Sequence, residues 1–500
     1  MKVEKSENEG ITLIALVITI IVLLILAGVS IATLTGENGI LTRAQDAKIN
    51  TEIAEEKEAI GLAYNGVMAE NEGNGVTAGQ LQIELRNNGY SNAEAIDNGD
   101  GTITVTFPDT KRKYVIDADG NITGEVPPTT TGKTDGSFDE EKGVNTPKLG
   151  NNMELVVYDE ETQEWVKDET NSAYSYKEQT GTTENGGTSE WANARVTING
   201  VESYFVWIPR YEYKIDEENE TIDVKFIPTT QTEATAGYII HPAFTADIEN
   251  GGWTEELSGL WIGKYEVSQS DAGTTADDMG NSEIIQIQPN VTSWRNMTIG
   301  QMYDKAKSYL SELQSHMLKN SEWGAVAYLT HSKYGRNGTE VTINNNKNYL
   351  TGNAGDSVDA SGSATINAYN TEKGVLASST GNVYGIYDLS GGSYEYVASY
   401  YSGSTNSNLT NNGSQLVNET NREYVTAYDG TDVDTDYKQG DATKETKRWN
   451  SDTANFVILN SPFFVRGGFY GSVFLAGIFF FNTFNGNGYS DSGFRVCLAV

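Results

Sequence analysis

The side chains that most often carry out chemistry in proteins are scarce in this chain. It has one cysteine, Cys497, and three histidines, His241, His316 and His331, which lie far apart in the sequence. A single cysteine excludes an intrachain disulfide and any site with several thiolate ligands. The histidines lack the spacing of a zinc site. The sequence therefore predicts neither a metal centre nor thiol chemistry.

Acidic residues are abundant, but no pair of them is marked out for catalysis. The chain contains 69 Asp and Glu residues against 34 Lys and Arg residues, which gives a formal net charge of −35. Because a phosphate-binding surface needs clustered basic residues, this balance argues against a nucleic-acid partner. No context singles out a carboxylate pair for glycoside hydrolysis or a hydrolytic triad. Most of the acids are expected to be solvated.

The C-terminal segment, residues 466–496, reads RGGFYGSVFLAGIFFFNTFNGNGYSDSGFRV. A strand with one face on a core alternates apolar and polar residues, and the run 478–481 does not. Either both of its faces are covered, or one face presents aromatic groups to a ligand. We expect Ile478, Phe480, Phe494 and Val496 to be core. The residues expected to be exposed and to bind a ligand are Phe469, Tyr470, Ser472, Val473, Phe474, Leu475, Phe481, Thr483, Phe484, Tyr489 and Asp491.

The elements that position this segment are many short strands and two helices. The first helix is expected over 298–319, with Thr298 and Gln301 as a capping box, and the second over 321–335 with Gly335 as its stop. The stretches 336–381 and 402–455, rich in Asn, Gly, Ser and Thr, are expected to be surface loops. Helices and strands that do not alternate regularly predict an α+β fold.

The N-terminal part predicts a membrane anchor followed by a small domain. Residues 11–34 carry no charge and are long enough to span a bilayer, and an amphipathic helix is expected to continue this span to residue 70. A short helix over 76–86 and hairpin strands over 102–125 predict a small α+β unit over 71–125. Residues 126–148 are expected to be a linker, and residues 149–500 one large domain.

The N-terminal segment resembles the signal of type IV prepilins. The leader, residues 1–10, ends in Gly10 directly before the apolar run that starts at Ile11. The resemblance implies cleavage between Gly10 and Ile11, a pilin-like headpiece over 71–125 and association with other pilin subunits. Ile11 stands where the family usually has Phe, and Ala15 where most members have Glu. A simple signal anchor is the alternative.

Residues 149–500 resemble formylglycine-generating-enzyme-like (sulfatase-modifying-factor) domains, which elaborate the C-type lectin fold. The phrases that carry the resemblance are LWIGKYEVSQ (260–269), SEWGAVAYL (321–329), GNVYGIYDLSGGSYEYV (381–397), RGG (466–468) and GFRV (493–496). The resemblance implies that Trp207, Trp261, Trp323 and Tyr394 are mostly core.

The family's chemistry does not transfer to this chain. Its copper-binding cysteines follow the RGG motif, and no cysteine stands there in this sequence, so we expect no enzyme activity. The family also binds structural calcium near the DLSGG turn. Gly392 replaces the usual Asn of that site, which leaves Asp388 and Glu395 as candidate ligands. We therefore expect no bound cofactor, with structural calcium as the open alternative.

The segment from RGG to GFRV also resembles the variable region of retroelement-diversified lectin-fold proteins of phages and bacterial surfaces. Diversified codons in that family exclude Trp, Met, Lys, Gln and Glu, and none of these occurs between Gly467 and Gly493. The resemblance implies a non-enzymatic, adhesin-like protein of the bacterial cell surface or of a pilus. Its ligand would be a protein or glycan on another cell or phage. The alternatives are a cell-surface enzyme or pseudoenzyme of the formylglycine family and a structural minor pilin.

Overall fold

The computed structural model describes residues 40–73, 75–108, 110, 112–126, 132–179, 188–356 and 359–500. The chain divides into two compact units, Met1–Thr130 and Thr131–Val500. The expected membrane segment 11–34 and the expected cleavage position, Gly10 and Ile11, lie outside the described residues. None of the helices within the described ranges has the length and apolar character needed to cross a membrane.

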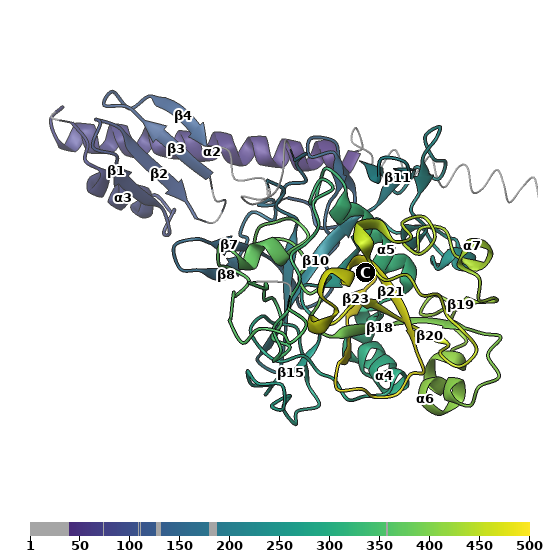
Figure 1. The fold of residues 1–500 in the computed structure, drawn as a ribbon. Helices are drawn as coiled ribbons and strands as arrows, with labels where there is room; N and C mark the ends of the chain where they lie inside the picture. The colour runs from purple at the N-terminus through teal and green to yellow at the C-terminus, as the bar shows by residue number, and fades with distance from the viewer. Residues whose placement is uncertain are drawn as a thin grey trace, which may run out of the picture. The chain divides into compact units, whose positions relative to one another are not determined.

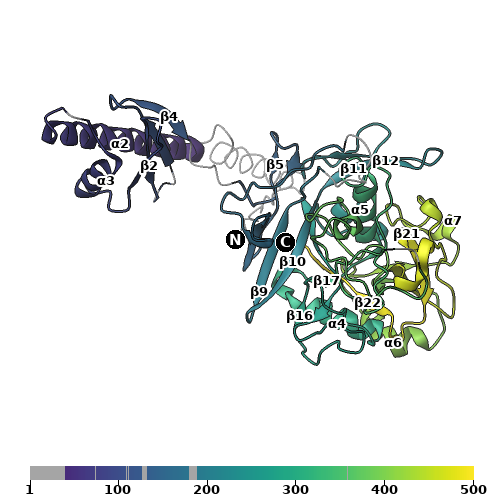
Figure 2. The same ribbon diagram turned by 60° about the vertical axis from the view of Figure 1, so that its left-hand side comes forward.

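The smaller unit combines two helices with one antiparallel sheet. Its elements are α2 (Ile40–Glu70), α3 (Ala78–Asn87), β1 (Glu94–Asp97), β2 (Ile103–Phe107), β3 (Arg112–Ile116) and β4 (Ile122–Val126), with the strands in the order β1-β2-β3-β4. The helix and hairpin expected from the sequence are present, whereas β1, which lacks an alternating apolar pattern, was not predicted. Ile60, Leu81, Leu85, Val105 and Tyr114 are at the centre of its core, and Figure 2 shows α3 beside α2.

The larger unit combines helices with two large sheets, so the α+β prediction is confirmed. A seven-stranded sheet has the order β17 (His316–Met317), β23 (Val496–Leu498), β14 (Gly259–Gly263), β10 (Val201–Pro209), β9 (Asn193–Ile198), β7 (Met153–Asp159) and β8 (Glu164–Lys167). A five-stranded sheet has the order β19 (Thr426–Tyr428), β18 (Tyr394–Tyr401), β20 (Phe463–Gly467) and β21 (Gly477–Phe484), with β22 (Ser492–Phe494) paired to β18.

Smaller sheets complete the larger unit. They comprise β11 (Tyr211–Asp216), β12 (Thr221–Phe226) and β13 (Ile239–Ile240), then β15 (Ser268–Gln269) with β16 (Ile285–Gln286), and β5 (Phe138–Asp139) with β6 (Val144–Asn145). The β9–β10 hairpin shows how local sequence sets the fold. Its two-residue turn is Asn199-Gly200, and both residues have positive φ, 51° and 81°. Asn-Gly suits this turn because neither residue is strongly disfavoured there.

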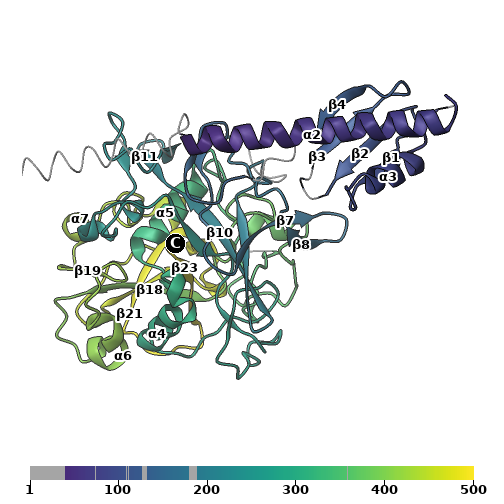
Figure 3. The same ribbon diagram turned by 180° about the vertical axis from the view of Figure 1, so that it is seen from behind.

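The helices of the larger unit are α4 (Ile299–Tyr309), α5 (Asn320–His331), α6 (Asn408–Val417) and α7 (Val433–Asp436). The capping box of Thr298 and Gln301 is present, but α4 ends ten residues before the predicted Lys319, because Leu310 (φ −137°, ψ 60°) leaves helical geometry. Helix α5 is buried on all sides, as expected for a central helix. In Figures 1 and 3, α4 and α6 lie beside each other near β18 and β21.

Three stretches differ from the expected linker and surface loops. The stretch 402–455 contains α6, β19 and α7, and Leu416 and Trp449 in it are buried. Within 126–148, Asn145 is fully buried, donates to the Ile227 carbonyl at 2.7 Å and accepts from Trp207 Nε1 at 3.1 Å, so this part packs on the larger unit. Within 336–381, the run Asn344–Asn346 is almost fully buried. Polar composition misled the prediction because Asn344 satisfies its amide internally, donating to the Leu350 carbonyl at 2.8 Å.

Candidate ligand-binding surface

The two ends of the C-terminal segment are fixed in both large sheets. Its start lies in β20 and its end in β22 and β23, so the frame joins the five-stranded sheet to the seven-stranded one. Arg466 is buried and donates to the carbonyls of Asp441 and Ala442 at 3.3 and 3.1 Å. Arg495 is also buried and forms a two-point ion pair with Glu395. These arginines hold the ends of the segment in place.

The run from Ile478 to Phe481 is covered on both faces, which settles the alternative left open by the sequence. Ile478, Phe479 and Phe480 belong to the main core of the unit. Trp323 Nε1 donates to the Ile478 carbonyl at 2.7 Å, which ties the strand to α5. The expectation that Ile478, Phe480, Phe494 and Val496 are buried is confirmed.

Phe481 corrects the predicted exposed set. Its side chain is fully buried in a second core with Val397, Tyr428, Phe456 and Phe464. This second core forms on the opposite side of β21 because residues 397–464 fold over that face, which the sequence of 478–481 alone does not indicate. Phe481 is therefore a core residue and does not belong to the exposed set.

The exposed apolar side chains of the segment lie in the short 3₁₀ helix Tyr470–Leu475, and its other exposed positions are Asn487, Gly488 and Ser490. Phe474 is 68% exposed, more than any other large apolar side chain of the described ranges, and Leu475 is 41% exposed. The other predicted surface residues are partly exposed: Phe469, Tyr470, Ser472, Val473, Thr483, Phe484, Tyr489 and Asp491. Their exposure is compatible with ligand contact, and their role in binding remains a prediction.

Half-buried aromatic rings line up beside this helix. Tyr394, expected to be core, is half-buried, and its ring lies 4.9 Å from that of Phe469 and 5.0 Å from that of Phe484. Phe469 contacts Tyr470 at 5.1 Å and Phe484 contacts Tyr489 at 5.4 Å. We call these five residues the aromatic row. Such rings supply apolar area with little conformational entropy to lose on binding.

The backbone of the exposed helix is strained at Val473. Its φ and ψ are 60° and −130°, a conformation that a β-branched residue rarely adopts. Strain of this kind costs roughly 1–3 kcal/mol and persists only where the surroundings enforce it. Sites of this kind are enriched where a protein binds ligands.

A pocket of about 550 Å³ opens next to Val473 and Phe474. Its walls come from residues 340–343, from 355–356, from Ser390 and Asn450, and from the segment itself through Val473, Phe474 and Ala476. Sequence reasoning missed all the walls outside the segment, because all of them except Ser390 lie in stretches expected to be surface loops. No local pattern in those loops signals a pocket.

The candidate calcium ligands do not fit a cation site. Asp388 accepts from Asn344 Nδ2 at 2.8 Å and from the Gly352 N–H at 2.9 Å, and Glu395 is occupied by Arg495. Calcium needs a shell of free oxygen ligands. Here the carboxylates already accept hydrogen bonds from protein donors.

At Gly392, the space that the usual Asn side chain of that turn would need is taken by Glu266. A Cβ at this position, where φ is +71°, would lie 2.5 Å from Oε1 of Glu266. Glu266 in turn accepts from the Ser393 N–H at 2.8 Å and from its hydroxyl at 2.7 Å. Burial, together with the nearby charges of Asp388 and Glu395, raises the pKa of Glu266 well above its usual value. A neighbouring carboxyl group therefore fills this corner of the core.

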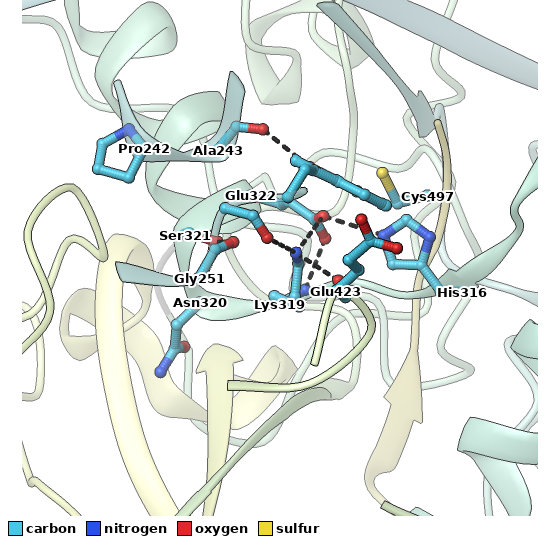
Figure 4. Close-up of polar contacts among 12 residues, drawn as sticks. Pro242, Ala243, Gly251, His316, Lys319, Asn320, Ser321, Glu322, Glu423 and Cys497 are labelled. Atoms are coloured by element: carbon cyan, nitrogen blue, oxygen red, sulfur yellow. Dashed lines mark hydrogen bonds and ion pairs between the residues drawn. The ribbon is translucent and has the colours of Figure 1, made fainter. Parts of the chain in front are cut away.

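Tertiary structure does bring His316, Glu322 and Cys497 together, with their ligand-type atoms within 4.8 Å of one another (Figure 4). His316 Nε2 lies 3.0 Å from Glu322 Oε1, and its Nδ1 lies 2.7 Å from the Gln314 carbonyl, so each ring nitrogen faces an acceptor. The Lys319 ammonium lies 3.4 Å from the same Glu322 oxygen. The cluster is thus a buried arrangement of charges around one carboxylate.

The electrostatics of this cluster disfavour a metal ion. Burial alone raises the pKa of Glu322, but His316 and Lys319 outweigh it and hold that pKa at about 2. Burial raises the pKa of the Cys497 thiol well above its usual value, so the thiol stays protonated and binds metals poorly. A metal would also have to displace Lys319. The donor set fits an internal ion pair.

Comparisons with known proteins add little. No family model matches the sequence, and no curated protein matches it. Among solved structures, "Major Tropism Determinant I1 Variant" is 11% identical, with 72% of this chain and 96% of that chain covered and a TM-score of 0.25. "Major Tropism Determinant U1 Variant" is 12% identical, with coverages of 74% and 98% and a TM-score of 0.23. Similarity this low defines neither the fold nor the function of this chain.

Proposed function

We propose that this protein is a non-enzymatic recognition protein of a bacterial cell surface or pilus. Its C-terminal surface would bind a protein or glycan on another cell or phage. The observation that carries the proposal is the exposed pair Phe474 and Leu475, which lies beside a pocket and between the buried ends of the segment, where Arg466 is hydrogen-bonded and Arg495 is ion-paired. Exposed apolar groups on a rigid frame are typical of interaction sites.

Further support comes from the composition of this surface. The pocket walls carry no histidine, cysteine or lysine. The segment between Gly467 and Gly493 also lacks the five residue types that diversified codons exclude. We therefore include retroelement diversification of this segment in the proposal, together with anchoring through residues 11–34.

A binding experiment with matched variants tests the proposal. The labelled full-length chain is incubated with a panel of intact bacterial cells and phages, and binding is compared with that of the F474S/L475S variant. The control is I458S/L459S, which replaces two apolar side chains of similar exposure, 50% and 48%, that lie outside the segment. We expect the first variant to lose binding and the control to keep it. Equal binding by all three chains would favour a purely structural pilin.

Diversification has its own test in the genome. A reverse transcriptase gene and a near-identical repeat of the segment's coding sequence should lie beside this gene, with differences confined to adenines of the repeat. If neither is present, the segment is not diversified, whatever it binds.

A further inference from the structure

The pocket beside Phe474 has a one-sided charge. Two of its walls carry carboxylates, Glu340 and Asp356, and none carries a basic residue. Asp356 is already paired with Lys373 at 2.8 Å. Glu340 differs: within the part of the chain that the structure describes, its carboxylate has hydrogen-bond donors but forms no ion pair. Among the described residues, the pocket therefore holds one acidic group without an ion-pair partner.

The surroundings of Glu340 keep this acid poorly solvated. Its Oε1 accepts from the Val341 N–H at 3.3 Å, and its Oε2 accepts from Asn450 Nδ2. Arg336 is close, but its guanidinium donates to the Glu340 backbone carbonyl, at 3.3 Å, and not to the carboxylate. Asp452 is buried and accepts from the Phe479 N–H at 3.0 Å, and burial together with the charge of Glu340 raises the pKa of Asp452 well above its usual value. These conditions favour a ligand that brings a positive charge.

The remaining walls favour an apolar stem. Val341, Ile343, Val473 and Ala476 are aliphatic, and the exposed Phe474 ring stands at the edge. An aromatic face attracts an ammonium or guanidinium group in addition to burying methylene groups. A volume of about 550 Å³ accommodates a ligand of several heavy atoms. A cation on a hydrocarbon stem, such as a lysine or arginine side chain, has both properties.

We propose that this pocket binds a lysine or arginine side chain of a partner protein, with Glu340 facing the cation and Phe474 packing on its stem. The inference rests on the proposed function, because it names the chemistry of the partner at that surface. The net charge of −35 favours the approach of such a basic epitope.

The proposal predicts a defined pH dependence. Burial raises the pKa of Glu340 to about 7, with hydrogen bonds from Val341 and Asn450 and the charge of Arg336 opposing that rise. The carboxylate is therefore mostly ionised at pH 8 and mostly protonated at pH 6. Since only the ionised form attracts a cation, affinity should fall about tenfold from pH 8 to pH 6, in line with the loss of the competent fraction. A neutral ligand should show no such change.

Ligand-observed NMR with the full-length chain tests this with n-pentylammonium and its neutral analogue 1-pentanol. We expect the ammonium to bind more tightly than the alcohol at pH 8, and E340Q to lose this preference. F474A should weaken both ligands, and E312Q, which neutralises an exposed acid elsewhere, should change neither. Nα-acetyl-lysine amide and Nα-acetyl-arginine amide then show which cation is preferred.

Three results would overturn the inference: no binding of the ammonium, equal binding of the alcohol, or an ammonium affinity that E340Q and pH leave unchanged. The comparison of ligands and the pH series use the unmodified chain, so they decide the matter even if E340Q fails to fold. If cell binding depends on Phe474 and Leu475 but any of these three ligand results is obtained, the proposed function stands. Only the binding of a cationic side chain in this pocket is then excluded.

Discussion

Replacing Glu322 with Gln should destabilise the larger unit strongly, because this carboxylate neutralises buried positive charge. Lys319 has no exposed surface, and its ammonium otherwise contacts the Gly252 and Glu423 carbonyls and the Trp253 ring. Removing one partner of a buried pair typically costs about 3–5 kcal/mol, since the remaining charge stays desolvated. The substitution keeps the size of the side chain, so packing contributes little to the loss.

The pKa of Glu322 gives a second measure of the same magnitude. The folded state lowers it from 4.5 to about 2, and each pKa unit corresponds to about 1.4 kcal/mol, which gives roughly 3 kcal/mol. Because the folded pKa is below the unfolded one, this stabilisation is complete above pH 4.5. It is lost progressively as the pH falls toward 2. The difference between wild type and E322Q should therefore be greatest at neutral pH and shrink below pH 4.5.

Urea unfolding followed by tryptophan fluorescence measures this effect selectively. All eight tryptophans lie between residues 165 and 449, within the larger unit, so the signal of the full-length chain excludes the smaller one. In the E322Q background, K319M should recover part of the lost stability, because it removes the unpaired charge. The reasoning is refuted if E322Q costs less than about 1 kcal/mol at pH 7, or if the two substitutions are simply additive.

Three further predictions test other parts of the structure by the same measurement. Because the folded pKa of Glu266 is raised, stability should fall as the pH rises above about 4.5. E266Q should flatten that decline between pH 5 and pH 8. Equal slopes of stability against pH in wild type and E266Q would contradict this account. V473G should be no less stable than wild type, since Gly accepts the positive φ. The control V465G, in a buried strand, should lower the free energy of unfolding by about 3 kcal/mol. A comparable loss in both variants would show that Val473 is unstrained. G324A should lower the free energy of unfolding by about 1–3 kcal/mol, despite the better helix propensity of Ala. The reason is that its Cβ would lie 1.9 Å from the Gly440 carbonyl oxygen, a backbone atom with little freedom to move. An unchanged urea midpoint would mean that this contact relaxes.

Local signals in the sequence determined several elements. The Thr298–Gln301 capping box set the start of α4, and the Asn199-Gly200 turn set the β9–β10 hairpin. The ends of the C-terminal segment, from RGG to GFRV, proved to be strands at buried positions. The cap and the turn depend on backbone geometry and hydrogen bonds within a few residues, so the sequence encodes them directly. The two ends of the segment were recognised by their motifs, but their strands pair with the distant β18.

Tertiary structure alone decided which side chains meet. The sequence left open whether the phenylalanine run had one covered face or two, and Phe481 is buried because residues 397–464 cover the second face. His316 and Cys497, 181 positions apart (497 − 316), meet because β17 pairs with β23. The pocket likewise joins Glu340 and Asn450 to Phe474. Burial and charge pairing depend on contacts between distant segments, and no local pattern specifies them.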